Sequence, residues 1–514
     1  GMIYLVELTG YTDAAVSAVY RFATADYTTA RADTPADTLY EGRVLGIGSI
    51  SRSMFRPGES GVRANPRSEV GVGVITLANV DGGLDALFDG TVSFRERAVS
   101  VYSVEPGAAY SSKVLRLRAV ISQAALRLDT VEVSIKDRLY ELSSPHSTQA
   151  YGGTNVLPAG VDGGPELAAK PKPQVFGKVF GVGPVAVNTS RLIYQISARA
   201  LQCVQAVYDG GSALTAGAAY ADQADMEAVP PTPGQYRAWL AGGMIRLAST
   251  PTYCITVDCT ADSSGGSTAA QLIKTLALAR GISSGDISAA DVAALDTANN
   301  AVCGVLLRGN ESTLDLMDEL ANSVGAWYGF DRGGTLRMAR YGLPAGTAGD
   351  GSMPVVARWN ARSLEQVPNG EDVPTQTVRV RYARHWQPIG SGEFAGAVPA
   401  ADRADLSQEW RTAEYSAAPS PNPYARPLTV ERDTALTTQA AALAEATRLH
   451  ALTAASRRTH RALGVAGVNA DIAAEVELRW DRYGLGDVIG TPRLVIEMTE
   501  DLLAQTADLT LWGP

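Results

Sequence analysis

Four histidines are the first residues to test for acid–base or metal chemistry. They are His146, His385, His450 and His460. No two of them stand three to five residues apart, so the sequence holds no HxxxH or HExxH zinc motif. His450 and His460 flank the end of an expected Ala-rich helix. We therefore expect histidines at the surface or at a helix end, and no metal-binding residues.

The four cysteines show no spacing that points to a metal site or a disulfide framework. They are Cys203, Cys254, Cys259 and Cys303, and none belongs to a CxxC pair. Four cysteines in 514 residues fit a chain made in a reducing cytoplasm. We expect them to be small, buried, hydrophobic side chains.

No nucleophile or phosphate motif stands out. The sequence has no GxSxG elbow, and the glycine-rich stretch 177–183 is followed by Pro184 and lacks a GK[ST] ending. A glycosidase would need an acid and a second carboxylate across a cleft, a separation that sequence does not reveal. Asp81, Asp315 and Asp331 fall at caps or turns, which predicts solvated or capping roles. We predict no catalytic residue, no cofactor-binding residue and no cofactor.

One strand combines basic and aromatic residues. Arg379, Arg381 and Arg384 follow one side of it, with Tyr382 and His385-Trp386 nearby. The functional interpretation is contact with DNA or an anionic glycan, and the alternative is a solvated or interface strand face. The formal net charge is -10, and an acidic chain repels phosphate and acidic lipid. Direct nucleic-acid binding is therefore not expected.

Length and composition indicate a globular protein with several domains. At roughly 150 residues per domain, 514 residues make three or four. Hydrophobic residues make up 46% and charged residues 19%, enough to bury large cores. No run of 18 apolar residues predicts a membrane-spanning helix, and residues 3–8 are expected to form a strand and not a signal peptide. Trp327, Tyr328 and Trp512 are expected to anchor cores.

The hydrophobic period changes along the chain. Residues 2–145 alternate as strands do and suggest a small barrel or sandwich. The expected strands there are 72–77, 99–104, 114–121 and 131–135, with turns at 56–58, 81–83 and 105–107.

The centre of the chain mixes hairpins and helices. Hairpins are expected at 204–215, 236–247 and 327–338. Ser267 is expected to cap a helix that ends at Gly281. Ser288 with Asp291, and Ser312 with Asp315, resemble capping boxes that open two more helices.

The last part of the sequence predicts strands and one helix. Strand 377–383 lies between loop-rich stretches that include Pro419, Pro421, Pro423 and Pro427. A helix follows at 434–455. The remaining strands are 474–480, 485–489 and a final hairpin of 494–496 with 509–512.

These patterns predict an α+β fold, mainly β, with two β-domains flanking a central α/β region. A Gly/Pro-rich stretch marks the main boundary. The expected parts are an N-terminal β-barrel-like domain (1–151), a Gly/Pro-rich connector (152–173), a central α/β domain with β-hairpins and helices (174–343), a loop-rich segment with strand 377–383 (344–433), and a C-terminal helix plus β-domain (434–514).

Several stretches resemble tail proteins of long-tailed bacteriophages and prophages. The first is GPELAAKPKP at 164–173, which runs into FGKV at 176–179. The second comprises LIYQI at 192–196, AVYDGG at 206–211 and ALTAG at 213–217. Weaker matches are ANVDGGLD at 78–85 and GAWYGFDRGG at 325–334. Together they are scattered over about residues 75–340. In the C-terminal third the similarity lies mainly in the order of a helix, the LGDV stretch at 485–488 and a terminal hairpin.

The family that this resemblance points to is the tail hub, or tail-tip, structural proteins. Membership implies a homotrimeric ring at the distal end of the tail, without catalysis. Two β-barrel-like domains per subunit would then present six similar units to the six-fold tail tube. The implied partners are the tail tube or distal-tail ring, the tape-measure protein and a central spike or fibre. The implied location is the virion tail tip, after assembly in the host cytoplasm.

Two alternatives belong to other functional classes. One is a receptor- or glycan-binding tail-tip protein that uses the loops of 387–427. The other is a peptidoglycan-degrading tail enzyme, since some hub relatives carry fused wall-cutting domains. No segment of this chain bears such a signature, so we do not carry that activity over.

Overall fold

Strands predominate in the computed structural model of the chain. Strands hold 41% of the residues and helices 16%, which confirms an α+β fold that is mainly β. The two-barrel arrangement stays a prediction. The expected turn at 56–58 and the four prolines at 419–427 lie outside the described residues. The structure describes residues 2–12, 17–54, 66–68, 70–261, 266–368, 373–418, 428–468 and 470–514.

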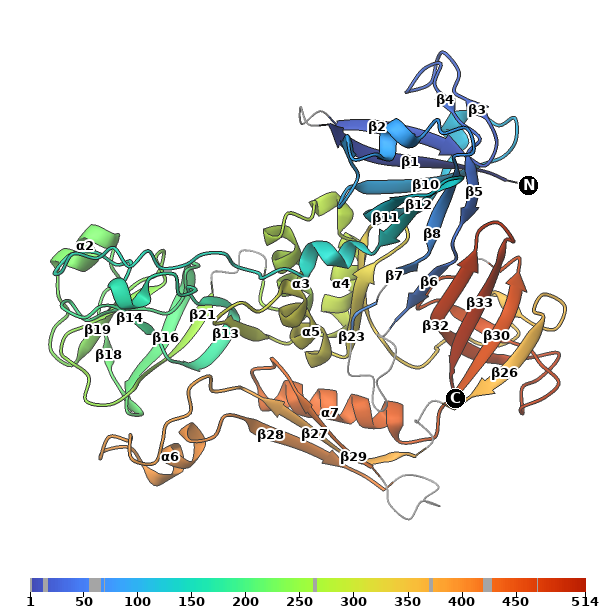
Figure 1. Cartoon of the computed structure of the whole chain (residues 1–514). Helices are drawn as coiled ribbons and strands as arrows, with labels where there is room; N and C mark the ends of the chain where they lie inside the picture. Colours follow the sequence, from blue (N-terminus) through green and yellow to red (C-terminus); the bar gives the residue numbers. More distant parts are fainter. Residues whose placement is uncertain are drawn as a thin grey trace.

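An eight-stranded antiparallel sheet forms the N-terminal part (Figure 1). Its order is β2–β1–β10–β11–β12–β8–β5, and β9 pairs with the end of β1. Val131, Val133 and Ile135 of β12 are buried and alternate with half-buried polar residues, as the period predicts. The bounds are β1 Ile3–Thr12, β2 Ser17–Ala23, β5 Val44–Ile47, β8 Val74–Ala78, β9 Val92–Ser93, β10 Ala98–Val104, β11 Val114–Leu126 and β12 Thr130–Lys136.

Short elements decorate this sheet. They are the hairpin of β3 Tyr27–Thr28 and β4 Leu39–Tyr40, the helix α1 Asp85–Phe88, and the 3-10 turns η1 Tyr110–Ser112 and η2 Arg138–Leu142.

The C-terminal part is a second eight-stranded sheet. Its order is β25–β31–β32–β33–β30–β26, with β6 added beside β32 and β7 beside β6. The expected final hairpin is confirmed as the antiparallel pair β32–β33. The bounds are β6 Ile50–Ser53, β7 Val70–Val72, β25 Val355–Val356, β26 Ser363–Val367, β30 Arg458–Ala466, β31 Glu475–Leu478, β32 Thr491–Asp501 and β33 Thr506–Gly513.

Two strand predictions need correction. The strand expected at 72–77 is divided between two sheets, because Gly73 lies against Gly48 where β7 gives way to β8. The strand expected at 485–489 is wrong. These residues form a tight loop in which the Trp480 amide donates to the Gly486 carbonyl at 2.9 Å. A Cβ at Gly486 would lie 1.9 Å from the Ile489 carbonyl oxygen, so the loop needs glycine there.

Strand β6 joins the two large sheets. Its residues 50–53 pair with residues 497–500 of β32. The Met54 amide continues the ladder by donating to the Ile496 carbonyl at 2.7 Å. Arg52 is 2% exposed, forms an ion pair with Asp471, and donates to the Phe330 carbonyl at 3.4 Å. Figure 1 shows β6 and β7 running from the N-terminal sheet toward the C-terminal one.

Three helices and a hairpin fill the centre of the molecule (Figure 1). Ser288 and Ser312 cap α4 and α5 as expected, and Ser312 with Asp315 forms a complete capping box. The cap of α3 is Thr268 and not the expected Ser267. The elements are α3 Ala269–Ala279, η4 Ser284–Asp286, α4 Ala289–Ala298, α5 Thr313–Ser323, β23 Ala326–Phe330 and β24 Leu336–Arg340.

Two five-stranded sheets enclose a separate apolar core. Their orders are β17–β16–β21–β13–β22 and β14–β15–β20–β19–β18. The hairpins expected at 204–215 and 236–247 are confirmed as β16–β17 and β19–β20. The bounds are η3 Pro165–Leu167, β13 Gln174–Val182, β14 Val185–Asn188, β15 Ile193–Gln195, β16 Leu201–Asp209, β17 Ser212–Ala213, β18 Thr215–Ala216, α2 Gln223–Ala228, β19 Gln235–Trp239, β20 Met244–Leu247, β21 Ile255–Ala261 and β22 Gly304–Leu307.

A three-stranded sheet, β28–β27–β29, packs against the helix α7. The strand expected at 377–383 is confirmed as β27. The helix α6 and strands β28 and β29 lie in stretches expected to be loop-rich, because their short, polar sequences carry little hydrophobic pattern. The bounds are β27 Thr375–Tyr382, α6 Ala400–Leu406, β28 Arg411–Ser416, β29 Leu428–Asp433 and α7 Gln439–Thr453. None of the described helices combines the length and hydropathy needed to cross a membrane.

All four histidines are buried, so the expectation of exposed histidines is wrong. Their exposed fractions are 8% for His146, 5% for His385, 7% for His450 and 0% for His460. His450 does lie in the last turn of α7, as expected, whereas His460 lies in β30. Burial, with a smaller contribution from Arg493 and Arg458, lowers the pKa of His460 to about 4.

Replacing His460 by Phe should reduce the loss of stability in acid. The unfolded chain binds the proton near pH 6.5 and the folded chain only near pH 4, so folding is penalised as the pH falls through this window. Between pH 7 and pH 5 the free energy of unfolding should fall by about 2 kcal/mol more in the wild type than in H460F. Urea denaturation at the two pH values measures this. An equal loss in both proteins would contradict a buried neutral ring.

Candidate functional site

A cavity of about 540 Å³ lies where the β13–β16–β21 sheet meets the segment that follows β27. Its walls combine aromatic rings, carboxyl groups, an imidazole and a guanidinium group. The aromatic residues are Phe180, Tyr208 and Tyr382; the acids are Asp258, Asp402 and Asp405; the imidazole is that of His385 and the guanidinium that of Arg411.

Residues 385–411, which we call the docked segment, are fastened to the sheet by their backbone. The Trp386 amide donates to the Phe180 carbonyl at 3.1 Å, and the Gln387 amide donates to the Gly181 carbonyl at 2.8 Å. Further along, the Ala395 amide donates to the Gly210 carbonyl at 2.9 Å. These bonds close one side of the cavity with main chain, which holds the lining residues in place.

An apolar cluster holds the middle of the docked segment. Ile389, Phe394 and Val398 are buried together, and Leu406 and Cys254 pack against them. A Cβ at Gly211 would lie 3.1 Å from a Leu406 methyl carbon, so the turn between β16 and β17 fits closely under the segment. The docked segment is therefore packed against the sheet and not only tethered at its ends.

Asp258 projects from β21 into the cavity and is held by two donors. The Gly181 amide donates to its Oδ1 at 2.8 Å, and the Tyr208 hydroxyl lies 3.5 Å from its Oδ2. Burial raises the pKa of Asp258, and these two hydrogen bonds oppose the rise. The carboxyl group thus ionises less readily than an exposed aspartate.

Arg411 connects the other polar groups of the cavity. Its Nε donates to Asp405 Oδ1 at 2.7 Å, and its Nη2 lies 3.1 Å from His385 Nε2. The hydrogen bonds from Arg411 hold the pKa of Asp405 below its usual value, whereas burial, followed by the charge of Arg411, lowers the pKa of His385. Because a guanidinium only donates, His385 Nε2 must accept and the imidazole is neutral.

This arrangement offers hydrogen bonding and aromatic contact. The pKa of Asp258 is raised and that of Asp405 is lowered, so the two carboxyl groups differ in their readiness to hold a proton. In the described part of the chain, no three His, Cys, Asp or Glu residues are grouped so that they could hold a metal ion. The cavity can therefore recognise a ligand that both donates and accepts hydrogen bonds.

The basic-aromatic strand is divided between two faces. Tyr382 and His385 line the cavity, whereas the three arginines are half-buried or exposed elsewhere and are paired with acids. This pairing favours the solvated-face interpretation over binding of an anion. The pairs are Arg379–Glu414 at 2.7 Å, Arg384–Glu409 at 2.7 Å, Arg381–Glu431 at 3.2 Å, and Arg381–Asp433.

The cysteines and the glycine-rich stretch 177–183, which the sequence analysis also considered, supply no reactive side chain to the cavity. Cys259 and Cys303 are buried, Cys203 and Cys254 are half-buried, and all four are free thiols. Burial raises the pKa of Cys303 to about 12, which suits an inert thiol. The stretch 177–183 lies mostly within β13 and forms no phosphate loop, and Gly181 adopts a φ of +56° where His385 approaches.

The acids and aromatic residues named from the sequence have structural positions. Asp81 is ion-paired with Arg43, Asp315 caps α5, and Asp331 accepts a hydrogen bond from the Thr335 amide at 2.9 Å. The expected core anchors are buried; their exposed fractions are 4% for Trp327, 0% for Tyr328 and 2% for Trp512. Sequence reasoning missed Asp258, Asp402, Asp405 and Arg411, and the Asp-x-x-Asp spacing at 402–405 was the one local signal.

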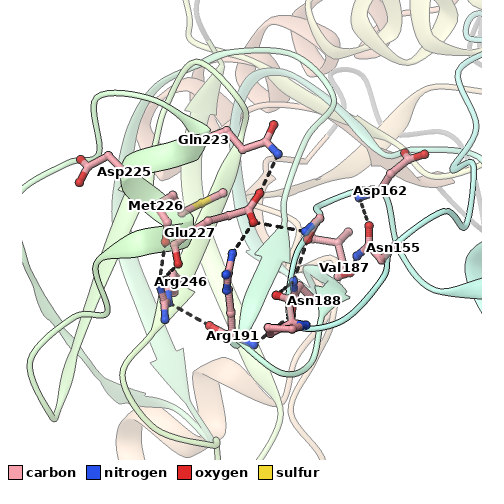
Figure 2. A network of polar contacts seen from close by, with 12 residues as sticks. Asn155, Asp162, Val187, Asn188, Arg191, Gln223, Asp225, Met226, Glu227 and Arg246 are labelled. Atoms are coloured by element: carbon pink, nitrogen blue, oxygen red, sulfur yellow. Dashed lines mark hydrogen bonds and ion pairs between the residues drawn. The ribbon is translucent and has the colours of Figure 1, made fainter.

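A second polar cluster fastens the stretch 155–162 to the neighbouring sheet (Figure 2). Asn188 donates to the Pro158 and Gly160 carbonyls at 3.0 and 2.7 Å, and Asn155 donates to the Val187 carbonyl at 2.7 Å. The two cations are occupied: Arg191 pairs with Glu227, and Arg246 donates to the Met226 carbonyl at 2.7 Å. Because its groups bind one another, this cluster positions the chain and is not a ligand site.

Replacing Gly210 by Ala should loosen the docked segment. Gly210 has a φ of +54°, and a Cβ there would lie 2.7 Å from the Glu393 carbonyl oxygen. We expect a loss of about 1–3 kcal/mol in unfolding free energy and faster trypsin cleavage after Arg403. Gly392→Ala is the matched control, because a Cβ at Gly392 meets nothing within 4 Å. Equal cleavage rates in the two variants would show that the segment is not held at Gly210.

Comparisons with known proteins give structural neighbours only. No family model matches the chain, and no curated protein matches it. Solved structures that it resembles include the 43 kDa tail protein of prophage MuSo2 from Shewanella oneidensis, with 11% identity, a TM-score of 0.40 and coverage of 99% of this chain and 98% of that one. A tail protein from Neisseria meningitidis MC58 has 10% identity, a TM-score of 0.38 and coverage of 93% and 94%.

A third neighbour is a chain of the virion of a native gene transfer agent particle. Its identity is 13% and its TM-score 0.42, with coverage of 67% of this chain and 84% of that one. The neighbours are two tail proteins, one of a prophage and one from a bacterium, and a virion component.

Proposed function

We propose that the chain is a non-enzymatic structural subunit of the tail-tip hub of a long-tailed bacteriophage or prophage. It forms a homotrimeric ring that joins the tail tube or distal-tail ring to a central spike or fibre, and it contacts the tape-measure protein. It acts at the virion tail tip, after assembly in the host cytoplasm. The observation that carries the proposal is the pair of eight-stranded sheets held together by β6 and β7.

A ring that meets a six-fold tube through three chains needs two β-units per chain at a fixed spacing. Here one sheet is built mainly from residues 3–136 and the other mainly from residues 355–513. Because β6 belongs to the C-terminal sheet while β5 and β8 belong to the N-terminal one, the spacing cannot change without breaking a strand pair. Large complementary surfaces, and not a reactive cleft, are what ring assembly requires.

One rim of the C-terminal sheet presents apolar side chains. Trp359 is 76% exposed, Val488 74% and Ile489 61%. Strands β25 and β31 are parallel, so the loops that carry these residues leave the same end of the sheet. An ion pair of 2.6 Å between Arg358 and Asp481 ties the two loops together. Exposed apolar groups gathered in this way mark interaction surfaces, and a second copy in the ring would cover them.

Sedimentation equilibrium of the full chain tests the ring. At high protein concentration we expect a species of three times the 53.9 kDa chain mass. Trp359→Glu should shift the equilibrium toward monomer by at least tenfold, because a charge would have to be buried at the contact.

Val156→Glu is the control for this variant. Val156 is 82% exposed and directly follows Asn155, which belongs to the polar cluster of Figure 2 and not to the rim loops. The Val156→Glu variant should have the same association constant as the wild type. A wild-type protein that stays monomeric at the highest soluble concentration, also when mixed with tail-tube protein, would overturn the proposal.

A further inference from the structure

We propose that the cavity beneath the docked segment binds a neutral saccharide unit, without cleaving it. Such a site would add recognition of a surface glycan to a structural subunit. The inference does not rest on ring formation, because every lining group comes from one copy of the chain.

The size and walls of the cavity suit a sugar. Its volume of about 540 Å³ falls in the range of roughly 300–1,000 Å³ that ligand pockets occupy. Phe180, Tyr208 and Tyr382 supply aromatic surface for the apolar face of a pyranose ring. Carboxylates at Asp402 and Asp405 supply acceptors for hydroxyl groups.

The charges in the cavity select against an anionic sugar. Arg411 is the one arginine or lysine among the described lining residues, and Asp405 already binds it through two nitrogens. An added carboxylate or phosphate would face Asp258, Asp402 and Asp405 without a free cation to offset them. A uronic acid, a sialic acid or a phosphosugar is therefore disfavoured.

The mixture of donors and acceptors also favours a sugar over a basic side chain. The Tyr208 hydroxyl can donate as well as accept, and the carboxyl groups are acceptors. A polyhydroxylated ligand can satisfy both kinds of group, whereas an ammonium or guanidinium group only donates.

The polar groups are already fixed before any ligand arrives. The Gly181 amide holds Asp258, and the Ala383 carbonyl accepts from Arg411 Nη1 at 3.2 Å. His385 is 5% exposed and held against Arg411. A ligand would thus meet a preorganised surface, which reduces the entropy lost on binding.

A glycan array probed with the full chain is the first test. We expect signals from neutral hexose or N-acetylhexosamine glycans and none from sialylated or uronic-acid glycans. An array without signals, or with signals from anionic glycans alone, would overturn the proposal. A neutral glycan that binds and is then cleaved would overturn the non-catalytic part.

Two variants locate the binding in the cavity, and their affinities are measured by titration calorimetry with the strongest neutral glycan on the array. Asp402→Ala and Tyr208→Leu should each weaken binding about tenfold or more. Asp402 is exposed on α6, so its replacement leaves the fold intact. Asp350→Ala and Tyr140→Leu are the controls at exposed positions outside the cavity. Binding that survives both cavity variants would overturn the assignment, whatever the oligomeric state proves to be.

Discussion

The pairing of β6 with β32 is the constraint that fixes the N-terminal and C-terminal sheets relative to each other. β6 follows β5 of the N-terminal sheet along the chain but pairs with β32, and Arg52 within it forms an ion pair with Asp471, 419 residues further along the chain. Arg52 is almost fully buried, and a buried cation without its partner costs several kcal/mol. The ladder and the ion pair therefore form together, and the C-terminal sheet is complete only when N-terminal residues are present.

Much of the secondary structure follows from local patterns. The alternation at 131–135 predicts β12, and Ser312 with Asp315 predicts the start of α5, because each signal acts within a few residues. Local patterns do not predict strands whose sequences contain few apolar residues. β28 and β29 are half-exposed and polar, and they exist because they pair with β27. The division of β7 from β8 depends on a second sheet that no local window contains.

The cavity could not be predicted from local sequence because its walls come from distant segments. Asp258 and Tyr208 belong to neighbouring strands, whereas His385, Asp405 and Arg411 arrive through the docked segment. The arginines of 379–384 suggested an anion site because their acidic partners lie on β28, on β29 or just before β28, in stretches that the sequence predicted to be loops. Burial of the histidines was equally hidden, since a polar residue becomes buried only through tertiary packing.

The positions of the cavity and of the apolar rim allow recognition and assembly to be separate properties. Figure 1 shows α6 and β16 at one end of the molecule and β26, β30 and β33 at the other, with the helices α3, α4 and α5 between them. The rim at Trp359 belongs to the C-terminal end, whereas the docked segment packs on the β13–β16–β21 sheet. A copy that covers the rim would not have to cover the cavity. In the proposed ring, contact between copies at the rim would therefore leave each cavity open to the proposed ligand.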